Sequence, residues 1–143
     1  MDLHQAVAQY HAAADEFARG HALPVKMIFS HHDDVTLANP FGPAVHGWQE
    51  VSAALDFASS RFRDGEVTSV ETIAAYETPD LATIVELERW KAKVSGRDDV
   101  IRFDLRVTST FRREDGDWKL VARHADPISS FDPNGPLRMI SSS

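Results

Sequence analysis

Two residues near the end of the last predicted strand are suited to acid–base chemistry. His124 and Asp126 lie two positions apart, and residues two apart on a strand point to the same face. By the same alternation, Trp118, Leu120 and Ala122 share that face. An imidazole held by a carboxylate can act as a general base. In the structural alternative, His124 hydrogen-bonds a neighbouring strand and Asp126 caps the end of the sheet.

The segment 33–48 is typical of the mouth of a pocket. A short alternating stretch, Val35–Ala38, breaks at Asn39-Pro40, and a helix follows Gly47. The amide of Asn39 could hold a ligand oxygen. Alternatively, Asn-Pro simply initiates a turn.

A third set of polar residues lies on the predicted strand 99–113. Arg106 and Thr108 share one of its faces with Arg102 and Asp104. An Arg106 that points inward would anchor a carboxylate or an enolate. A cross-strand ion network would explain the same residues, and we slightly prefer the network.

Glu86, Glu88 and Trp90 form one face of the predicted strand 81–94. Two carboxylates and an aromatic ring could line a pocket. The wetted side of a sheet, or a dimer face with ion pairs, more often produces this alternation. We therefore expect this face to lie outside.

Several aromatic side chains are candidates for an apolar lining, although most residues of this kind belong to the core. Tyr10 differs from the others because its hydroxyl group needs a partner when it is buried. The full set is Tyr10, Phe17, Phe41, Trp48 and Phe57.

Other chemistries are disfavoured by what the chain lacks. It contains no cysteine, no HExxH motif, no Gly-rich phosphate loop and no nucleophile elbow. The run His31–Asp34 resembles a metal site, but adjacent residues on a strand point to opposite faces. We therefore expect no metal and no cofactor.

Composition limits the partners. A net charge of -7 and a pI near 5.4 argue against nucleic acid and anionic membranes, which need clustered positive charge. We see no signal peptide at the N-terminus and no apolar stretch near the roughly 20 residues that span a bilayer. A cytoplasmic location is the expectation.

Hydrophobic spacing predicts helices over 3–17, from Pro24 to Phe29, and from Trp48 to Phe62. Four long strands follow at 66–78, 81–94, 99–113 and 118–126. Helices followed by an antiparallel meander indicate a single α+β domain. Long strands coil, so a concave space should remain between the sheet and the helices.

Three segments carry a resemblance to a known family. The stretches LANPFGPAVHGW, LRVTSTFRREDGDWKLV and RHADP resemble the SnoaL-like branch of the nuclear transport factor 2-like superfamily, often called ketosteroid isomerase-like, over residues 6–128. The resemblance implies a cone of three N-terminal helices on a strongly curved antiparallel sheet, with a tail at 129–143. It also implies homodimers that pair through the sheet and a ligand site inside the cone.

The resemblance also bears on the chemistry. The family's steroid isomerases carry a basic Asp in Asp-Pro-x-Gly, where this chain has Asn39. They carry a second acid where this chain has Thr108–Thr110, and only Tyr10 could replace their phenol. The position of His124 matches a histidine that commonly faces the cavity in this family, and Asp126 is the nearest carboxylate.

These observations predict a protein that binds a small apolar or mixed organic ligand. One hypothesis is a cofactor-free isomerase, dehydratase or hydrolase with His124, Asp126 and Tyr10 as catalytic residues. The alternative is a ligand-binding or dimerisation module without catalysis. The expected ligand-binding residues are Asn39, Arg106, Thr108, Phe41, Trp48, Phe57 and Trp90.

Overall fold

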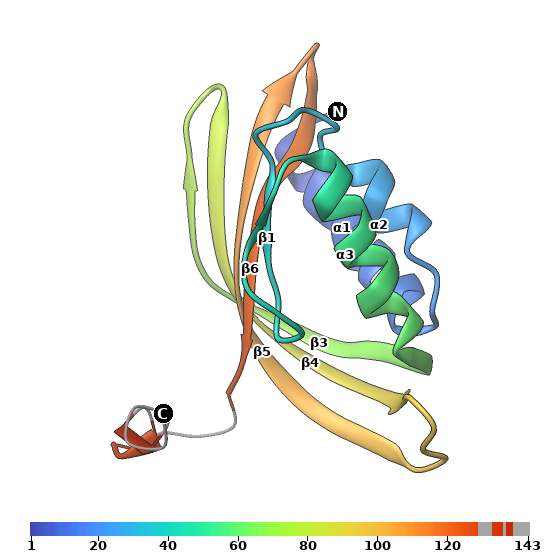
Figure 1. Ribbon diagram of the computed structural model, residues 1–143. Coiled ribbons are helices and arrows are strands. Elements are labelled where there is room, and N and C mark those ends of the chain that lie inside the picture. Colours follow the sequence, from blue (N-terminus) through green and yellow to red (C-terminus); the bar gives the residue numbers. More distant parts are fainter. Residues whose placement is uncertain (129–132, 136, 139–143) are drawn as a thin grey trace.

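The computed structural model describes residues 1–128, 133–135 and 137–138, so most of the predicted tail at 129–143 lies outside the described residues. Helices come first and long strands follow, as the sequence predicts (Figure 1). The elements are α1 (Leu3–Ala18), α2 (Leu23–Ile28), β1 (Thr36–Ala38), β2 (Val45–His46), α3 (Trp48–Ser60), β3 (Phe62–Glu77), β4 (Leu81–Val94), β5 (Val100–Glu114) and β6 (Asp117–Pro127).

One curved sheet holds all the strands of the described residues, in the order β2-β1-β6-β5-β4-β3. The four long strands form the predicted antiparallel meander. At the turn between β5 and β6, Asp115 and Gly116 have φ values of 51° and 85°. Two positive φ angles in succession are typical of a tight type I′ hairpin turn. The parallel pairing of β1 with β6 is a feature that the sequence does not predict.

The helices cover the concave face of the sheet (Figure 1). Helix α1 begins with a capping box, in which Asp2 Oδ1 accepts from Gln5 N at 2.8 Å and Gln5 Oε1 accepts from Asp2 N at 3.0 Å. Helix α3 ends at Ser60, two residues before the predicted end at Phe62. Phe62 instead begins β3 and pairs with Val94, because long-range strand pairing overrides the local helical spacing.

A bulge in β6 decides which residues of that strand face the helices. Thr110 pairs with Ala122 and Phe111 pairs with Leu120, so Val121 is an extra residue without an opposite partner. An inserted residue reverses the alternation of side chains beyond it. Trp118 and Leu120 therefore point inward, whereas Ala122 points outward.

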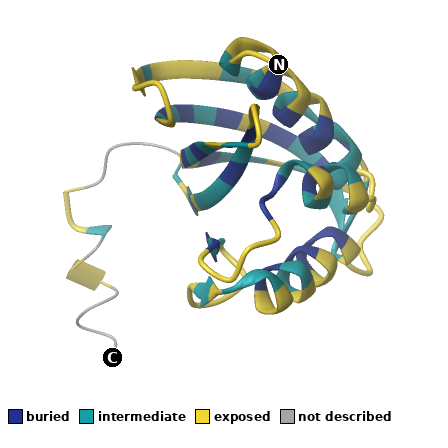
Figure 2. Cartoon of the chain, turned by 90° about the horizontal axis from the view of Figure 1, so that it is seen from above, coloured by how far each residue is buried: buried dark blue, intermediate teal, exposed yellow. Residues whose placement is uncertain are grey.

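The buried residues lie between the concave face of the sheet and the helices, as Figure 2 shows from above. One cluster joins α1, α2 and α3 to the end of β5 and the start of β6, around Phe29, Phe111 and Trp118. A smaller cluster around Ala18, Trp90 and Val107 packs α1 against the middle of the sheet. We call the face that meets the helices the inner face of the sheet and the opposite face the outer face.

Candidate functional site

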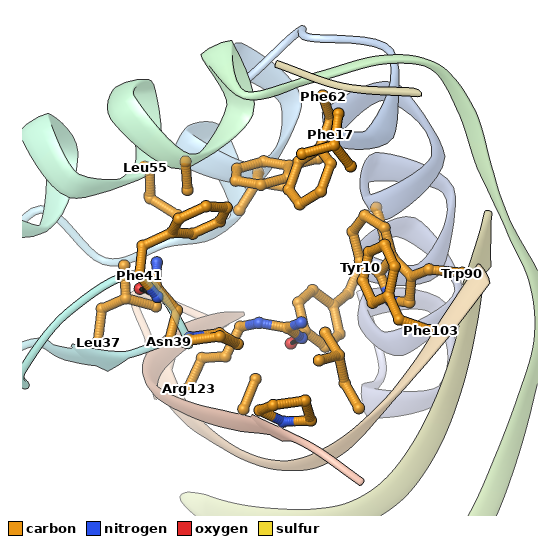
Figure 3. A pocket seen from close by; sticks show the side chains of 18 residues that line it. Tyr10, Phe17, Leu37, Asn39, Phe41, Leu55, Phe62, Trp90, Phe103 and Arg123 are labelled. Carbon is orange, nitrogen blue, oxygen red and sulfur yellow. Dashed lines mark hydrogen bonds between the residues drawn. The ribbon is translucent and has the colours of Figure 1, made fainter. Parts of the chain in front are cut away.

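A cavity of about 250 Å³ opens between the helices, the inner face of the sheet and the loop after β1 (Figure 3). Its wall is dominated by aromatic and aliphatic side chains. The lining residues are Tyr10, Ala14, Phe17, Val25, Leu37, Asn39, Pro40, Phe41, Leu55, Ala58, Phe62, Trp90, Val94, Phe103, Leu105, Arg123, Ala125 and Pro127.

Aromatic rings stack along one side of this cavity. Phe62, Trp90 and Phe103 contact one another, with centroid distances of 5.7 Å from Phe103 to each of the other two rings and 5.8 Å between Phe62 and Trp90. Phe17 meets Trp90 edge-on at 6.4 Å. Such a wall offers flat apolar surfaces to a ligand, and ring contacts of this kind add to the stabilisation from burial alone.

A buried polar network forms the floor of the cavity. Arg123 Nη1 and Nη2 donate to Glu88 Oε2 and Oε1 at 3.0 and 2.9 Å, and Nη1 also donates to the hydroxyl of Tyr10. Trp90 Nε1 donates to Glu88 Oε1 at 2.9 Å. The Tyr10 hydroxyl lies 2.9 Å from Ser109 Oγ. The carboxylate of Glu88 is thus held by three donated hydrogen bonds.

Burial and charge fix the protonation states of this network. Burial raises the pKa of Tyr10 to about 12, so its phenol stays neutral. Burial alone would raise the pKa of Glu88, but the charge and hydrogen bonds of Arg123 hold that pKa below its usual value. Burial alone would lower the pKa of Arg123, because it disfavours the charged guanidinium. The neighbouring carboxylate of Glu88 outweighs this effect and raises the pKa of Arg123. The floor therefore contains a neutral phenol and a charged pair.

A second buried carboxylate lies two residues earlier on β4. Glu86 is 1% exposed, and its Oε2 lies 2.8 Å from Nε2 of the half-buried His11. This hydrogen bond raises the pKa of His11. Within the described part of the chain, Glu86 Oε1 has no hydrogen-bond partner. Glu86 and Glu88 both lie on the inner face, so the expectation of a wetted or dimer-forming face is wrong.

Five of the candidate residues line the cavity: Tyr10, Phe17, Asn39, Phe41 and Trp90. Asn39 Oδ1 accepts from the backbone N–H of Phe41 at 3.1 Å. The interpretation of Asn39 as a turn residue is therefore confirmed, and the residue also borders the cavity. A contact between its amide and a ligand oxygen stays a prediction. Phe41 stands at the mouth, 42% exposed and in edge contact with Phe62.

Two predicted aromatic residues lie elsewhere. Trp48 stacks on the ring of His31 at a centroid distance of 3.9 Å and packs near Phe29. Phe57 is 55% exposed and meets Phe41 edge-on at 6.0 Å. Phe57 thus contacts a cavity residue, and the ring contacts of Trp48 are with residues outside the cavity lining.

The predicted acid–base pair exists, but on the outer face. His124 Nε2 lies 2.9 Å from Asp126 Oδ2, and the two side chains are 64% and 49% exposed. In the strand register Thr108 lies opposite His124, and Arg106 lies opposite Asp126. All four residues point away from the cavity. The expectation that His124 faces the interior is wrong because the bulge at Val121 reverses the alternation of β6.

The same reversal turns Arg123 inward, and sequence reasoning missed it. The signal that was available is physical: Arg123 lies in VARHA, where three of its four nearest neighbours along the strand are small and apolar. A buried arginine needs a carboxylate partner. Glu88, beside Trp90 on an alternating strand, was the matching signal for that partner.

Nothing in the described ranges gathers three or more His, Cys, Asp or Glu side chains in an arrangement that could hold a metal ion. Among the helices of those ranges, none has the length and apolar character required to cross a membrane.

Residues 3–128 match the family model of the SnoaL-like domain. The chain belongs to this family. None of the curated proteins is significantly similar in sequence.

Solved structures share the fold. A ketosteroid isomerase-like protein from Erwinia carotovora atroseptica is 18% identical with a TM-score of 0.74, over 90% of this chain and 95% of that one. A candidate dehydratase of the NTF2-like family from Streptomyces avermitilis is 19% identical with a TM-score of 0.70, over 90% and 94%. An NTF2-like superfamily protein from Salmonella enterica is 11% identical with a TM-score of 0.74, over 92% of both chains.

Proposed function

We propose that this SnoaL-like protein reversibly binds a compact, largely apolar organic molecule in the cone. The observation that carries the proposal is the aromatic-walled cavity of about 250 Å³. A cavity of about 150 Å³ lined by apolar side chains is sufficient for benzene. The larger volume therefore suits a molecule of two fused rings, and apolar burial supplies the affinity.

The chemistry of the lining residues supports binding without turnover. Among the described lining residues, the polar side chains are those of Asn39, Tyr10 and Arg123. An amide, a neutral phenol and a guanidinium do not accept a proton from carbon or water near neutral pH. A general base must lie within hydrogen-bond reach of the proton that it removes. An isomerase, dehydratase or hydrolase that used His124 and Asp126 would need both side chains inside the cone.

Filling the cavity tests the proposal. Ala58 lines the cavity from α3 and is 2% exposed, whereas Ala53 is on the exposed side of the same helix. We expect calorimetric titration with indane, a two-ring hydrocarbon, to show saturable binding to the wild type and to Ala53→Leu. Ala58→Leu should bind at least about tenfold more weakly, since its added methyl groups occupy the cavity. Equal affinity of both variants for indane would refute the proposal.

We also propose that a second copy of this chain pairs with the outer face of the sheet. The family resemblance suggests this arrangement, and the charges of the outer face support it. Arg106 lies opposite Asp126 in the strand register, and Asp126 pairs with His124. Both signs of charge on one patch allow it to complement itself across a two-fold axis.

A further inference from the structure

We propose that the bound molecule carries a neutral oxygen, such as a ketone carbonyl, that accepts hydrogen bonds from Arg123, and that the site rejects carboxylates. This inference rests on the proposed function and names the chemical class of its ligand. It depends on two features of the cavity floor: an unused donor edge and a charge that is already balanced.

The unused edge follows from the hydrogen bonds of Arg123. A guanidinium has five N–H donors in a fixed plane. Three of them are engaged, two by Glu88 and one by Tyr10. The remaining two are Nε–H and the second hydrogen of Nη2, which lie along one edge. No acceptor among the described residues is hydrogen-bonded to them.

The Nε and Nη2 atoms along this edge of an arginine can both donate hydrogen bonds to oxygen acceptors. Arg97 uses the same two atoms, Nε and Nη2, to hold both carboxylate oxygens of Asp99 at 3.0 and 2.9 Å. In Figure 3 the side chain of Arg123 extends along the cavity toward Tyr10. The side chain is 11% exposed, so an oxygen that reaches it is shielded from water.

The balance of charge between Glu88 and Arg123 then favours a neutral carbonyl oxygen over a carboxylate oxygen in the ligand. Glu88, 1% exposed, already neutralises Arg123 through two hydrogen bonds. Glu86, on the same face of β4, adds a further buried carboxyl group, whose nearest partner is His11. A carboxylate ligand would lose its hydration and meet no uncompensated positive charge. A neutral carbonyl loses far less hydration and still receives both hydrogen bonds.

A matched set of three probes tests this selectivity in the wild type. Indane, 1-indanone and indane-1-carboxylate share one skeleton and differ in the polar group. By calorimetric titration we expect 1-indanone to bind at least about tenfold more tightly than indane-1-carboxylate and more tightly than indane. Indanone that binds no better than indane would overturn the inference, as would a carboxylate that binds as tightly as the ketone. If none of the three binds, the proposed function fails and this inference fails with it.

Removing the compensating charge should invert the preference. Glu88→Gln keeps an acceptor oxygen for Trp90 and Arg123 but leaves the guanidinium uncompensated. We expect this variant to bind indane-1-carboxylate more tightly than 1-indanone. Glu71→Gln removes one charge from a side chain that is 56% exposed, and it should retain the wild-type preference. An unchanged preference in a folded Glu88→Gln variant would overturn the inference.

A measurement on the wild type covers the case in which Glu88→Gln fails to fold. The carbonyl stretching band of 1-indanone should move to lower wavenumber in the complex than in cyclohexane, because two donors polarise the carbonyl group. A bound ketone whose band stays at its cyclohexane position would contradict the inference while leaving apolar binding intact.

Discussion

Glu88 and Arg123 form an ion pair that joins two strands which are not neighbours in the sheet. Their hydrogen bonds measure 2.9 and 3.0 Å, and β5 lies between their strands, β4 and β6. The pair therefore spans β5 on the inner face of the curved sheet. It also forms the polar end of a cavity whose remaining wall is largely apolar.

Breaking this pair should destabilise the fold strongly. Glu88→Ala leaves the guanidinium of Arg123 buried without its carboxylate, and the loss of one partner from a buried pair costs about 3–5 kcal/mol. We expect the free energy of unfolding, measured by urea denaturation, to fall by that amount. The exposed Glu71→Ala should change it by no more than about 0.5 kcal/mol. Similar losses for the two variants would show that the buried pair does not stabilise the sheet.

Gly65 is a second position where a small change should be costly. A Cβ atom there would lie 2.6 Å from Ala92 Cβ and from the carbonyl oxygen of Lys91, and 2.8 Å from the carbonyl oxygen of Ala18, so β3 could not approach β4 and α1 as closely. We expect Gly65→Ala to lower the free energy of unfolding by about 1–3 kcal/mol.

Gly42 provides the matched control for this substitution. A Cβ atom at Gly42 meets nothing within 4 Å, so Gly42→Ala should change the free energy of unfolding by less than about 1 kcal/mol. Urea denaturation of the two variants makes the comparison. A Gly65→Ala protein as stable as the wild type would indicate that β3 does not pack tightly against Ala92 and Ala18.

The contact between His11 and Glu86 should make stability depend on pH. The hydrogen bond from Glu86 raises the pKa of His11 in the folded state. The resulting stabilisation is fully present below the unfolded pKa of about 6.5, and it is lost as pH rises through the folded pKa. The free energy of unfolding of the wild type should therefore fall relative to that of His11→Gln as pH rises above about 6.5.

A substitution at the exposed His4 is the control for this effect. His4→Gln should leave the pH dependence of the wild type unchanged. Parallel curves for the wild type and His11→Gln would show that the contact with Glu86 does not raise the pKa of His11 in the folded state.

Self-association through the outer face should respond to its charges. Arg106→Glu would place a negative charge opposite Asp126 and make the patch repel its copy. By sedimentation equilibrium we expect a wild-type dimer and a largely monomeric Arg106→Glu variant. Arg19→Glu, just beyond the end of α1, should remain dimeric. A wild type that is monomeric at high concentration would contradict the proposed pairing.

Local sequence signals were sufficient for most of the fold. The four long strands follow from alternating residues, and their hairpins follow from turn chemistry such as Asp115-Gly116. The helical spacing of Phe62 from Ala58 predicts that it belongs to α3. Only its pairing with Val94, which is remote in sequence, makes it a strand residue.

The site was harder to predict because a shift of one residue in the register of β6 decides which of its side chains face the cavity. Without the bulge at Val121, His124 and Asp126 would share the inner face with Trp118 and Leu120. With it, Arg123 faces inward instead. No local pattern marks the bulge, since Val121 is an ordinary strand residue. The buried position of Glu88 depends on Arg123, which lies two strands away, so the alternation of β4 alone does not show which of its faces is buried.

The most direct test of ligand binding in the cone is a crystal structure of the protein grown with 1-indanone. We predict electron density for the two rings against Trp90 and Phe103, with the ketone oxygen within hydrogen-bond distance of Arg123 Nε. Density for the ketone only at the outer face, with side chains filling the interior of the cone, would contradict this account.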